Sequence, residues 1–114
     1  MANLSSWFEG VPVSITVTDR QGNLREMNAR AREVCAGYGG GQLVGKNVLD
    51  CHPEPARTKT EELYREQTPN HYTVQKGSVR KIIHQLPWYE DNEFAGYVEL
   101  SISIPQTLPH FERD

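Results

Sequence analysis

The sequence predicts an α+β domain in which one antiparallel sheet carries short helices over one face. Residues 79–86 are rich in β-branched and apolar side chains, and residues 93–104 end in an alternation that places Val98, Leu100 and Ile102 on one side of a long strand. Residues 87–92 between them include acidic and amide side chains that tolerate turn conformations, so the two strands form a hairpin. A sheet with one apolar face needs helices to cover that face.

Length and composition limit the class of protein. A chain of 114 residues, 37% apolar and 24% charged, fits one globular domain. Its net charge of −3 provides no positive field for nucleic acid or an anionic membrane surface. No apolar run reaches the roughly 18 residues that a membrane span needs, and no signal peptide is recognisable. Cys35 and Cys51 are too few for a disulfide framework. We therefore expect a cytoplasmic protein without nucleic-acid or membrane partners, unless the chain is excised from a larger membrane-bound protein.

An N-terminal amphipathic helix is predicted over residues 1–10. Leu4, Trp7 and Phe8 recur at helical spacing, and Gly10 ends the run. Two large aromatic side chains on so short a helix need a surface to cover, which is either the back of the sheet or a second subunit. Apolar and β-branched patterns predict three further strands, at residues 13–17, 23–27 and 71–75. With the hairpin, these make five strands.

Helices are predicted between the second and third strands. Asn28 is a good N-cap for the first helix, whose apolar residues recur at helical spacing and are Ala31, Val34, Cys35 and Tyr38. Glycines 39–41 end this helix in a loop, and residues 42–49 are expected to form a short helical turn. A longer helix is predicted over residues 56–67, with Pro55 in its first turn, where a missing N–H costs nothing.

Several short motifs follow one another along the chain. They are Val17-Thr18-Asp19-Arg20-Gln21-Gly22, the helix-opening Asn28, Leu43-Val44-Gly45-Lys46-Asn47 and Asp91-Asn92-Glu93-Phe94-Ala95-Gly96-Tyr97-Val98. In this order and at these spacings they resemble a PAS domain over about residues 11–104. The resemblance implies a PAS-like five-stranded antiparallel sheet with short helices covering one face, which enclose a small-molecule pocket. It also implies a role in sensing or signal transduction, often as a dimer.

The resemblance divides the chain into three parts. Residues 1–10 are the N-terminal amphipathic helix, residues 11–104 the PAS-like domain, and residues 105–114 a C-terminal tail whose two prolines predict irregular structure. Cys51-His52-Pro53 also resembles a tripeptide found in a group of bacterial PAS proteins.

The residues do not single out a cofactor. In PAS domains that bind flavin and react with light, a cysteine directly follows the asparagine of a Gly-x-Asn motif, and here Val48 follows Asn47. The segment that begins at His52 resembles the start of the haem-bearing helix of oxygen-sensing PAS kinases, but Thr60 stands where the iron-ligating histidine is expected. His52 or Cys51 could ligate iron only if the loop turned inward. The alternative is that Cys51 is a buried apolar residue and His52 a hydrogen-bonded residue at a helix start. The cofactor, haem and flavin included, is left unassigned.

Metal binding and catalysis have little support. The candidate metal ligands share no metal-binding spacing and are Cys51, His52, His71 and His84. We therefore predict no metal site, and expect His71 and His84 to be exposed or paired across strands. No nucleophile motif or phosphate-binding loop is present, so we predict that the chain is not an enzyme. The enzymatic alternative is an isomerase-like site with Asp50 as base and Tyr38 or Tyr64 as donor.

Strand parity gives the candidate pocket. If Val98 and Leu100 face the helices, the pocket-facing parity of the family places Lys81, Ile83 and Gln85 inward too. The outward-facing residues are then Ile82, His84, Tyr97 and Glu99. A buried Gln85 amide needs a hydrogen-bond partner from protein, water or ligand; the alternative is that Gln85 and Lys81 reach the backbone or the sheet edge. The predicted ligand-binding residues are Cys51, His52, Tyr64, Ile83, Gln85, Val98 and Leu100.

These observations predict a sensory or regulatory domain of bacterial signal transduction, without catalysis of its own. A small molecule or a signalling partner would change the packing between sheet and helices, and the change would pass to the N-terminal helix or to a homodimer contact through that helix or the sheet. The output then lies in another protein or another part of the chain. The alternative is an interaction module with a filled core, which binds no ligand and docks a partner through Leu4, Trp7, Phe8 and the Trp88-Tyr89 pair.

Overall fold

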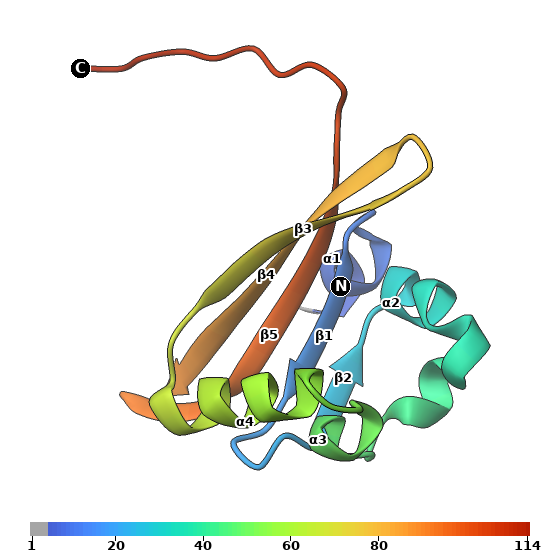
Figure 1. Cartoon of the computed structure of the whole chain (residues 1–114), viewed down its shortest axis with the longest axis vertical. Helices are drawn as coiled ribbons and strands as arrows, with labels where there is room; N and C mark the ends of the chain where they lie inside the picture. The colour runs from blue at the N-terminus through green and yellow to red at the C-terminus, as the bar shows by residue number, and fades with distance from the viewer. Residues whose placement is uncertain (1–4) are drawn as a thin grey trace.

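A five-stranded antiparallel sheet organises the chain, which confirms the predicted fold class (Figure 1). The computed structural model describes residues 5–114, so the predicted contact of Leu4 lies outside the described residues. The strands are β1 (Ser14–Thr18), β2 (Leu24–Met27), β3 (Asn70–Lys76), β4 (Val79–Glu90) and β5 (Glu93–Ile104). Their order across the sheet is β2-β1-β5-β4-β3, so the first and last strands of the chain pair at its centre.

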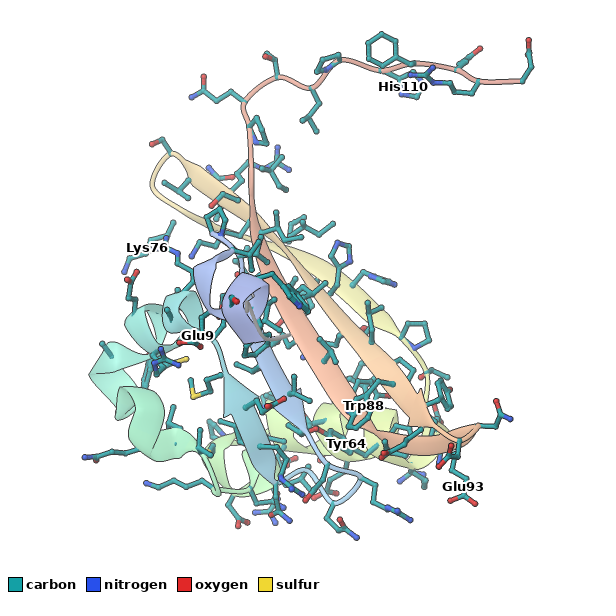
Figure 2. All side chains as sticks on the ribbon, turned by 180° about the vertical axis from the view of Figure 1, so that it is seen from behind. Glu9, Tyr64, Lys76, Trp88, Glu93 and His110 are labelled. Atoms are coloured by element: carbon teal, nitrogen blue, oxygen red, sulfur yellow. The ribbon has the colours of Figure 1, made fainter. Side chains whose placement is uncertain are left out.

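Short helices precede β1 and fill the chain between β2 and β3. The α-helices are α1 (Ser5–Gly10), α2 (Ala29–Val34), α3 (Val48–Cys51) and α4 (Ala56–Glu66), and the 3₁₀-helices are η1 (Ala36–Tyr38) and η2 (Gly40–Leu43). In Figure 1 α4 lies in front of the sheet, whereas in Figure 2, seen from behind, α1 lies in front. We call the sheet face toward α4 the inner face and the opposite face the outer face. No helix within residues 5–114 is long and apolar enough to cross a membrane.

The helices after β2 are shorter than the sequence predicts. Asn28 caps α2 as predicted, but α2 ends at Val34, and Tyr38 is 81% exposed in the 3₁₀-helix that follows. The glycines beyond this point are poor helix formers and favour the tight turns seen here. The helical turn expected over residues 42–49 is divided between η2 and α3, because Asn47 accepts a backbone hydrogen bond and begins a new helix.

The β4–β5 hairpin is tighter than predicted. β4 continues through most of the segment expected as the connection and ends at Glu90, so only Asp91 and Asn92 form the turn. Their φ angles are 52° and 66°. The type I′ hairpin turn has positive φ at both central positions, and aspartate and asparagine tolerate it better than most residues.

A one-residue bulge interrupts the ladder between β4 and β5. Tyr89 pairs with Phe94, but Trp88 pairs with Gly96, so Ala95 has no partner on β4. A bulge of this kind shifts the register by one residue. Because side chains alternate along a strand, a shift by one residue moves every later side chain of β5 to the other face relative to its partners.

The bulge overturns the predicted facing of β5. Gln85 lies opposite Glu99, whereas an uninterrupted ladder would set it opposite Val98. Tyr97 and Glu99 therefore face inward with Gln85 and line a cavity there, and the expectation that they face outward was wrong. Val98 and Leu100 lie on the outer face, so the expectation that they face the helices was also wrong. Val98, Leu100 and Ile102 share one face of β5 as the alternation predicts, but this face is the outer face of the sheet.

A cluster of buried apolar residues lies at the β2 end of the sheet. Leu24, Met27 and Ala31 are buried together, and the partly buried Cys35 and Leu43 pack against them. This cluster holds α2 and η2 against β2. The rest of the space under the helices is less completely filled, and the candidate site lies there.

Candidate functional site

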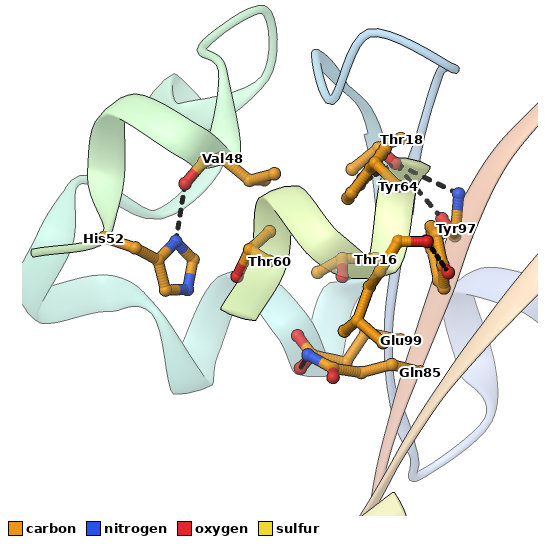
Figure 3. Close-up of a pocket in the computed structure, with 10 residues that line it drawn as sticks. Thr16, Thr18, Val48, His52, Thr60, Tyr64, Gln85, Tyr97 and Glu99 are labelled. Atoms are coloured by element: carbon orange, nitrogen blue, oxygen red, sulfur yellow. Dashed lines mark hydrogen bonds between the residues drawn. The ribbon is translucent and has the colours of Figure 1, made fainter. Parts of the chain in front are cut away.

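A small cavity lies between the inner face of the sheet and the α3–α4 segment (Figure 3). Its volume is about 60 Å³. A water molecule needs about 10–15 Å³ by such a measure, so the cavity suits a few waters or a ligand of a few heavy atoms. The side chains that line it come from β1, β4, β5 and the two helices, and are Thr16, Thr18, Val48, His52, Thr60, Leu63, Tyr64, Gln85, Tyr97 and Glu99.

A row of polar side chains crosses the inner face from β5 to β3 and ends in the cavity. Asn70, Gln85 and Glu99 stand opposite one another on the three neighbouring strands. The Asn70 amide donates to Gln85 Oε1 at 2.8 Å, and Gln85 Nε2 donates to Glu99 Oε1 at 3.1 Å. The row therefore has a direction, with the carboxylate as its final acceptor. The predicted need of Gln85 for a partner is met by these two neighbours.

The Glu99 carboxylate has no cationic partner among the described residues. The four ion pairs found in residues 5–114 all involve other acids. Burial raises the pKa of Glu99 above its ordinary value, and the hydrogen bond from Gln85 and the nearby His52 act in the opposite direction. Removing a carboxylate from water disfavours its charged form. The cavity thus holds an acid whose charge is incompletely compensated.

Two tyrosines and a threonine form the wall between sheet and α4. The hydroxyl groups of Tyr64 and Thr18 are 2.5 Å apart, and the Tyr64 and Tyr97 rings lie 4.7 Å apart. Burial raises the pKa of Tyr64 to about 12, so this phenol stays protonated. The Tyr97 hydroxyl is within hydrogen-bond distance of the Leu63 and Thr68 carbonyl oxygens, at 2.5 and 2.6 Å. These contacts fasten the C-terminal end of α4 to β5.

His52 and Thr60 form the side of the cavity away from β5. His52 is exposed, and its Nδ1 contacts the Val48 carbonyl oxygen, which orients the ring at the end of α3 (Figure 3). The Thr60 hydroxyl donates to the Ala56 carbonyl oxygen within α4. Figure 3 shows Thr60 between His52 and the Gln85–Glu99 pair.

The structure brings together three of the predicted ligand-binding residues. His52, Tyr64 and Gln85 line the cavity. Ile83 is buried on the inner face but does not line it, and Cys51 is exposed, contrary to the alternative that it is a buried apolar residue. Val98 and Leu100 are on the outer face, as described above. Ligand binding by any of these residues stays a prediction.

Sequence reasoning missed the residue that most defines the cavity. The alternating apolar residues of β5 predict that Val98 and Leu100 face the helices, which puts Tyr97 and Glu99 on the outer face. The sequence signal that could have found them is Gly96, since glycine inside a strand often marks a bulge.

The geometry does not suit the large cofactors considered from the sequence. A volume of about 60 Å³ is far below the roughly 300–1,000 Å³ of pockets for drug-sized ligands, and haem and flavin exceed it. The Nδ1 atom of His52 is already engaged by the Val48 carbonyl oxygen. Haem or flavin therefore does not fit between the sheet and the α3–α4 segment in this geometry.

The geometry supports neither a metal cluster nor the isomerase-like alternative. Residues 5–114 contain no group of three or more potential metal ligands. His71 and His84 form a cross-strand pair, as the sequence predicts, with their Nδ1 atoms 2.8 Å apart. Asp50 does not line the cavity that Tyr64 lines, and Tyr38 is exposed, so the suggested base and donors are not brought together.

Comparison with known proteins gives one family. The model of the family described as PAS fold matches residues 8–106. Comparison with curated proteins finds no match. Three similar solved structures are bacterial, and each has low sequence identity, so the likeness is one of fold.

The Vibrio cholerae Aer2 receptor, described as a dual PAS-heme oxygen sensor, is 18% identical, with a TM-score of 0.64 over 82% of this chain and 95% of that chain. The PAS domain of Bordetella pertussis BvgS is 22% identical, with a TM-score of 0.62 over 86% of this chain and 81% of that chain. A sensory box sensor histidine kinase from Vibrio cholerae is 9% identical, with a TM-score of 0.62 over 91% of this chain and 90% of that chain.

Proposed function

The chain belongs to the PAS fold family, and on that premise we propose that it is a sensory and regulatory module of bacterial signal transduction. A small molecule binds in the inner cavity and changes the packing between the sheet and α4. The module has no catalytic activity of its own and acts in the cytoplasm on an output that lies in another protein or elsewhere in its own polypeptide.

The observation that carries this proposal is the cavity, which is bordered by an acid whose charge is incompletely compensated. Most interiors are packed as densely as organic crystals, and buried polar groups are satisfied by neighbours. Here a carboxylate from β5 borders an unfilled space beneath α4. A filled, purely structural core would be expected to place an apolar residue at the position of Glu99.

The contacts around the cavity suggest how occupancy would reach the rest of the module. The polar row from Glu99 leads through Gln85 to Asn70 at the start of β3. The Thr18–Tyr64 hydroxyl contact leads to α4. A ligand that draws the Glu99 side chain toward itself would change the first connection, and a ligand that contacts Tyr64 would change the second. Coupling of this kind needs differential contacts in the free and bound states, which the carboxylate supplies.

The similar proteins support a signalling role by the descriptions they carry. One is described as an oxygen sensor that uses haem and another as a sensor histidine kinase. The proposal takes only the sensory role from them. Their cofactor is not transferred to this chain, because the cavity is too small for haem.

We also propose that the module works as a homodimer through α1 and the outer face. Trp7 on α1 is 63% exposed. The outer face carries the apolar stripe of β5 and its neighbours on β4, all half-buried: Ile82, Leu86, Val98, Leu100 and Ile102. Aromatic and aliphatic side chains that remain partly exposed together are typical of interface centres. Nucleic acid and membrane surfaces are not proposed as partners.

The second candidate function is a docking module that binds no small molecule. The small volume of the cavity and the apolar outer face favour it. The two functions differ in one measurable property, which is whether the cavity has an occupant.

Native mass spectrometry of the protein purified without added ligand separates them. The Thr60→Leu variant fills the cavity from α4, because Thr60 lines it and has its hydroxyl hydrogen bond only within the helix. Thr58→Leu is the matched control, since Thr58 is exposed on the same helix and does not line the cavity. A thermal-shift screen of small molecules accompanies both, so that a weakly held ligand lost during purification is still detected.

The sensory function predicts a bound small molecule, or a stabilising ligand in the screen, for the wild-type protein and for Thr58→Leu but not for Thr60→Leu. A bare polypeptide mass with no stabilising ligand in any of the three proteins would contradict the sensory function and favour the docking module.

A further inference from the structure

Every side chain that faces Glu99 across the cavity is neutral or weakly basic. From β1 and β4 these are two threonine hydroxyls and the Gln85 amide, and from the helices they are Thr60, Leu63 and Tyr64. The other titratable groups that line the cavity are His52 and the two tyrosines, and Cys35 and Tyr72 also interact electrostatically with Glu99. No lysine or arginine among the described residues pairs with Glu99. The positive charge that would balance this carboxylate is therefore not supplied by the lining.

Two side chains bring acceptor positions to the cavity, Glu99 and Thr60. A carboxylate offers about four acceptor positions, and Gln85 uses one of them. The Thr60 hydroxyl donates its hydrogen bond to the Ala56 carbonyl oxygen, so its oxygen is left as an acceptor toward the cavity. Donor-rich ligands fit such a site, and an alkylammonium group brings three N–H donors.

Size and ring chemistry narrow the ligand further. A volume of about 60 Å³ admits only a few heavy atoms. The rings of Tyr64 and Tyr97 line the same space, and aromatic faces attract organic cations. A bare divalent metal ion would need several oxygen ligands, and residues 5–114 contain no cluster that provides them.

We propose that the inner cavity recognises a small organic cation, a primary ammonium of a few heavy atoms, whose charge pairs with the Glu99 carboxylate. This assignment rests on the proposed sensory function and adds the ligand class to it. In the pair, the ammonium takes the place of a protein cation, and Gln85 holds the carboxylate in position. Occupancy then completes the polar row that runs from Glu99 to Asn70.

Proton linkage gives the binding a characteristic pH dependence. Burial raises the pKa of Glu99 above its ordinary value, so in the free protein this carboxyl keeps its proton to a higher pH than an exposed glutamate does. An alkylammonium stays charged below about pH 10. Affinity for the cation should therefore rise as the pH rises through the titration of Glu99, and should then level off.

The test uses three compounds of similar size and different charge: ethylammonium chloride, ethanol and sodium propionate, with sodium chloride as the salt control. Each is titrated into the ¹⁵N-labelled protein and followed by two-dimensional ¹H–¹⁵N NMR spectra. Ethylammonium is expected to shift the Gln85 side-chain amide and the backbone amides next to Glu99. Ethanol and propionate are expected to leave those signals in place.

Two variants assign the effect to one carboxylate. Glu99→Gln keeps an acceptor for Gln85 but removes the charge, and it should lower the affinity for ethylammonium by about tenfold or more. Glu93→Gln removes the same charge at an exposed position at the start of β5 and should bind like the wild type. If Glu99→Gln does not fold, the pH series on the wild-type protein decides by itself.

Equal shifts with propionate or ethanol, or unchanged binding by Glu99→Gln, would overturn the cation class. So would an absence of any shift with ethylammonium. The sensory function would survive all three outcomes if native mass spectrometry still finds a neutral or anionic occupant, and would fail with the cation class if the cavity has no occupant at all.

Discussion

Asn28 joins three elements through one buried side chain. Its Oδ1 atom accepts the backbone N–H groups of Ile15 and Ala31, both at 3.0 Å. Its Nδ2 atom donates to the carbonyl oxygens of Phe8 and Val13 at 3.0 and 2.7 Å. All four hydrogen-bonding positions of the amide are thus used, and the residue is completely buried. The sequence predicted only its role as a helix cap.

Replacing Asn28 should therefore cost more than losing a cap. Asn28→Ala leaves two buried N–H groups and two carbonyl groups without partners, and we expect the free energy of unfolding to fall by about 3 kcal/mol. Asn47→Ala is the comparison, because Asn47 caps α3 and makes two further side-chain hydrogen bonds from a more exposed position, and it should cost about 1–2 kcal/mol. Urea unfolding measures both, and an equal loss in the two variants would contradict the role assigned to Asn28.

Glu99 makes the free energy of unfolding depend on pH in the direction opposite to that of most carboxylates, whose pKa is lowered by folding. Because its pKa is raised in the folded protein, the folded state holds this proton more tightly than the unfolded state. The contribution of Glu99 to stability is therefore fully present below the ordinary glutamate pKa of 4.5 and is lost as the pH rises through the raised value. Glu99→Gln should gain stability relative to the wild type at neutral pH and much less in acid. Thermal unfolding of the wild type and Glu99→Gln at neutral and at acidic pH measures this difference in stability, with Glu93→Gln as control. The same difference at every pH would contradict the assignment.

At the scale of elements, the bulge between β4 and β5 is held by a close approach to β1. Gly96 has a φ angle of 144°, and a Cβ atom added there would collide with the Thr18 carbonyl oxygen. The Trp88 indole N–H donates to that same carbonyl oxygen at 3.0 Å, and the Tyr97 backbone N–H donates to the Thr18 hydroxyl at 3.1 Å. The bulge is thus fixed from both neighbouring strands.

Gly96→Ala should disrupt the sheet at this point. The added methyl group meets backbone atoms, which cannot move aside as a flexible side chain can, and the φ angle is unfavourable for alanine. We expect a loss of about 3 kcal/mol or more in the free energy of unfolding. Gly37→Ala is the control, because nothing lies within 4 Å of the position its Cβ would take. Similar stability in the two variants would show that β1 and β5 are not in close contact at Gly96.

The sequence predicts the elements well because each leaves a local pattern. Alternation marked β1 and the long strand β5, helical spacing and Pro55 marked α4, and Asn28 marked the start of α2. The boundaries that failed depend on contacts outside the local pattern. β4 extends to Glu90 because β5 pairs with it there, which no local preference of the Pro87-Trp88 segment indicates.

The site was predicted less well than the fold, for a physical reason. Alternation tells which residues of β5 share a face, but both faces of this sheet are covered in part, so apolar character did not identify the inner one. One unpaired residue, Ala95, sets the register that brings Glu99 opposite Gln85. The predicted inward facing of Gln85 is confirmed, because the extra residue lies on β5 and leaves the alternation of β4 unchanged. The facing of Val98 and Leu100 relative to β4 depends on the bulge, and the prediction for them was wrong.

At the scale of the whole molecule, the sheet and its helices form a compact body, whereas residues 105–114 extend away from it. The radius of gyration is 15.3 Å, above the roughly 13 Å expected for a compact domain of this length. Residues 105–114 form no helix or strand and run away from the body (Figure 1). Leu108 and Phe111 in this segment are 64% and 69% exposed.

The proposed homodimer makes a prediction at this scale. Leu100→Arg places a charge in the centre of the outer face, where a half-buried side chain leaves room for arginine to reach solvent. We expect it to weaken the dimer by about tenfold or more. Tyr38→Arg, at an exposed position in η1, is the control and should leave the dimer intact. Light scattering after size exclusion measures the mass of each; a monomeric wild type, or a dimeric Leu100→Arg, would remove the outer face from the interface.

The central claim is that filling the inner cavity changes the structure beyond it. Hydrogen–deuterium exchange of the wild type, Thr60→Leu and the control Thr58→Leu tests this without knowing the ligand, because the leucine at position 60 occupies the cavity permanently. Coupling through Gln85 and Asn70 predicts altered protection at the start of β3 for Thr60→Leu alone. A change confined to α4, or the same change in both variants, would contradict the account.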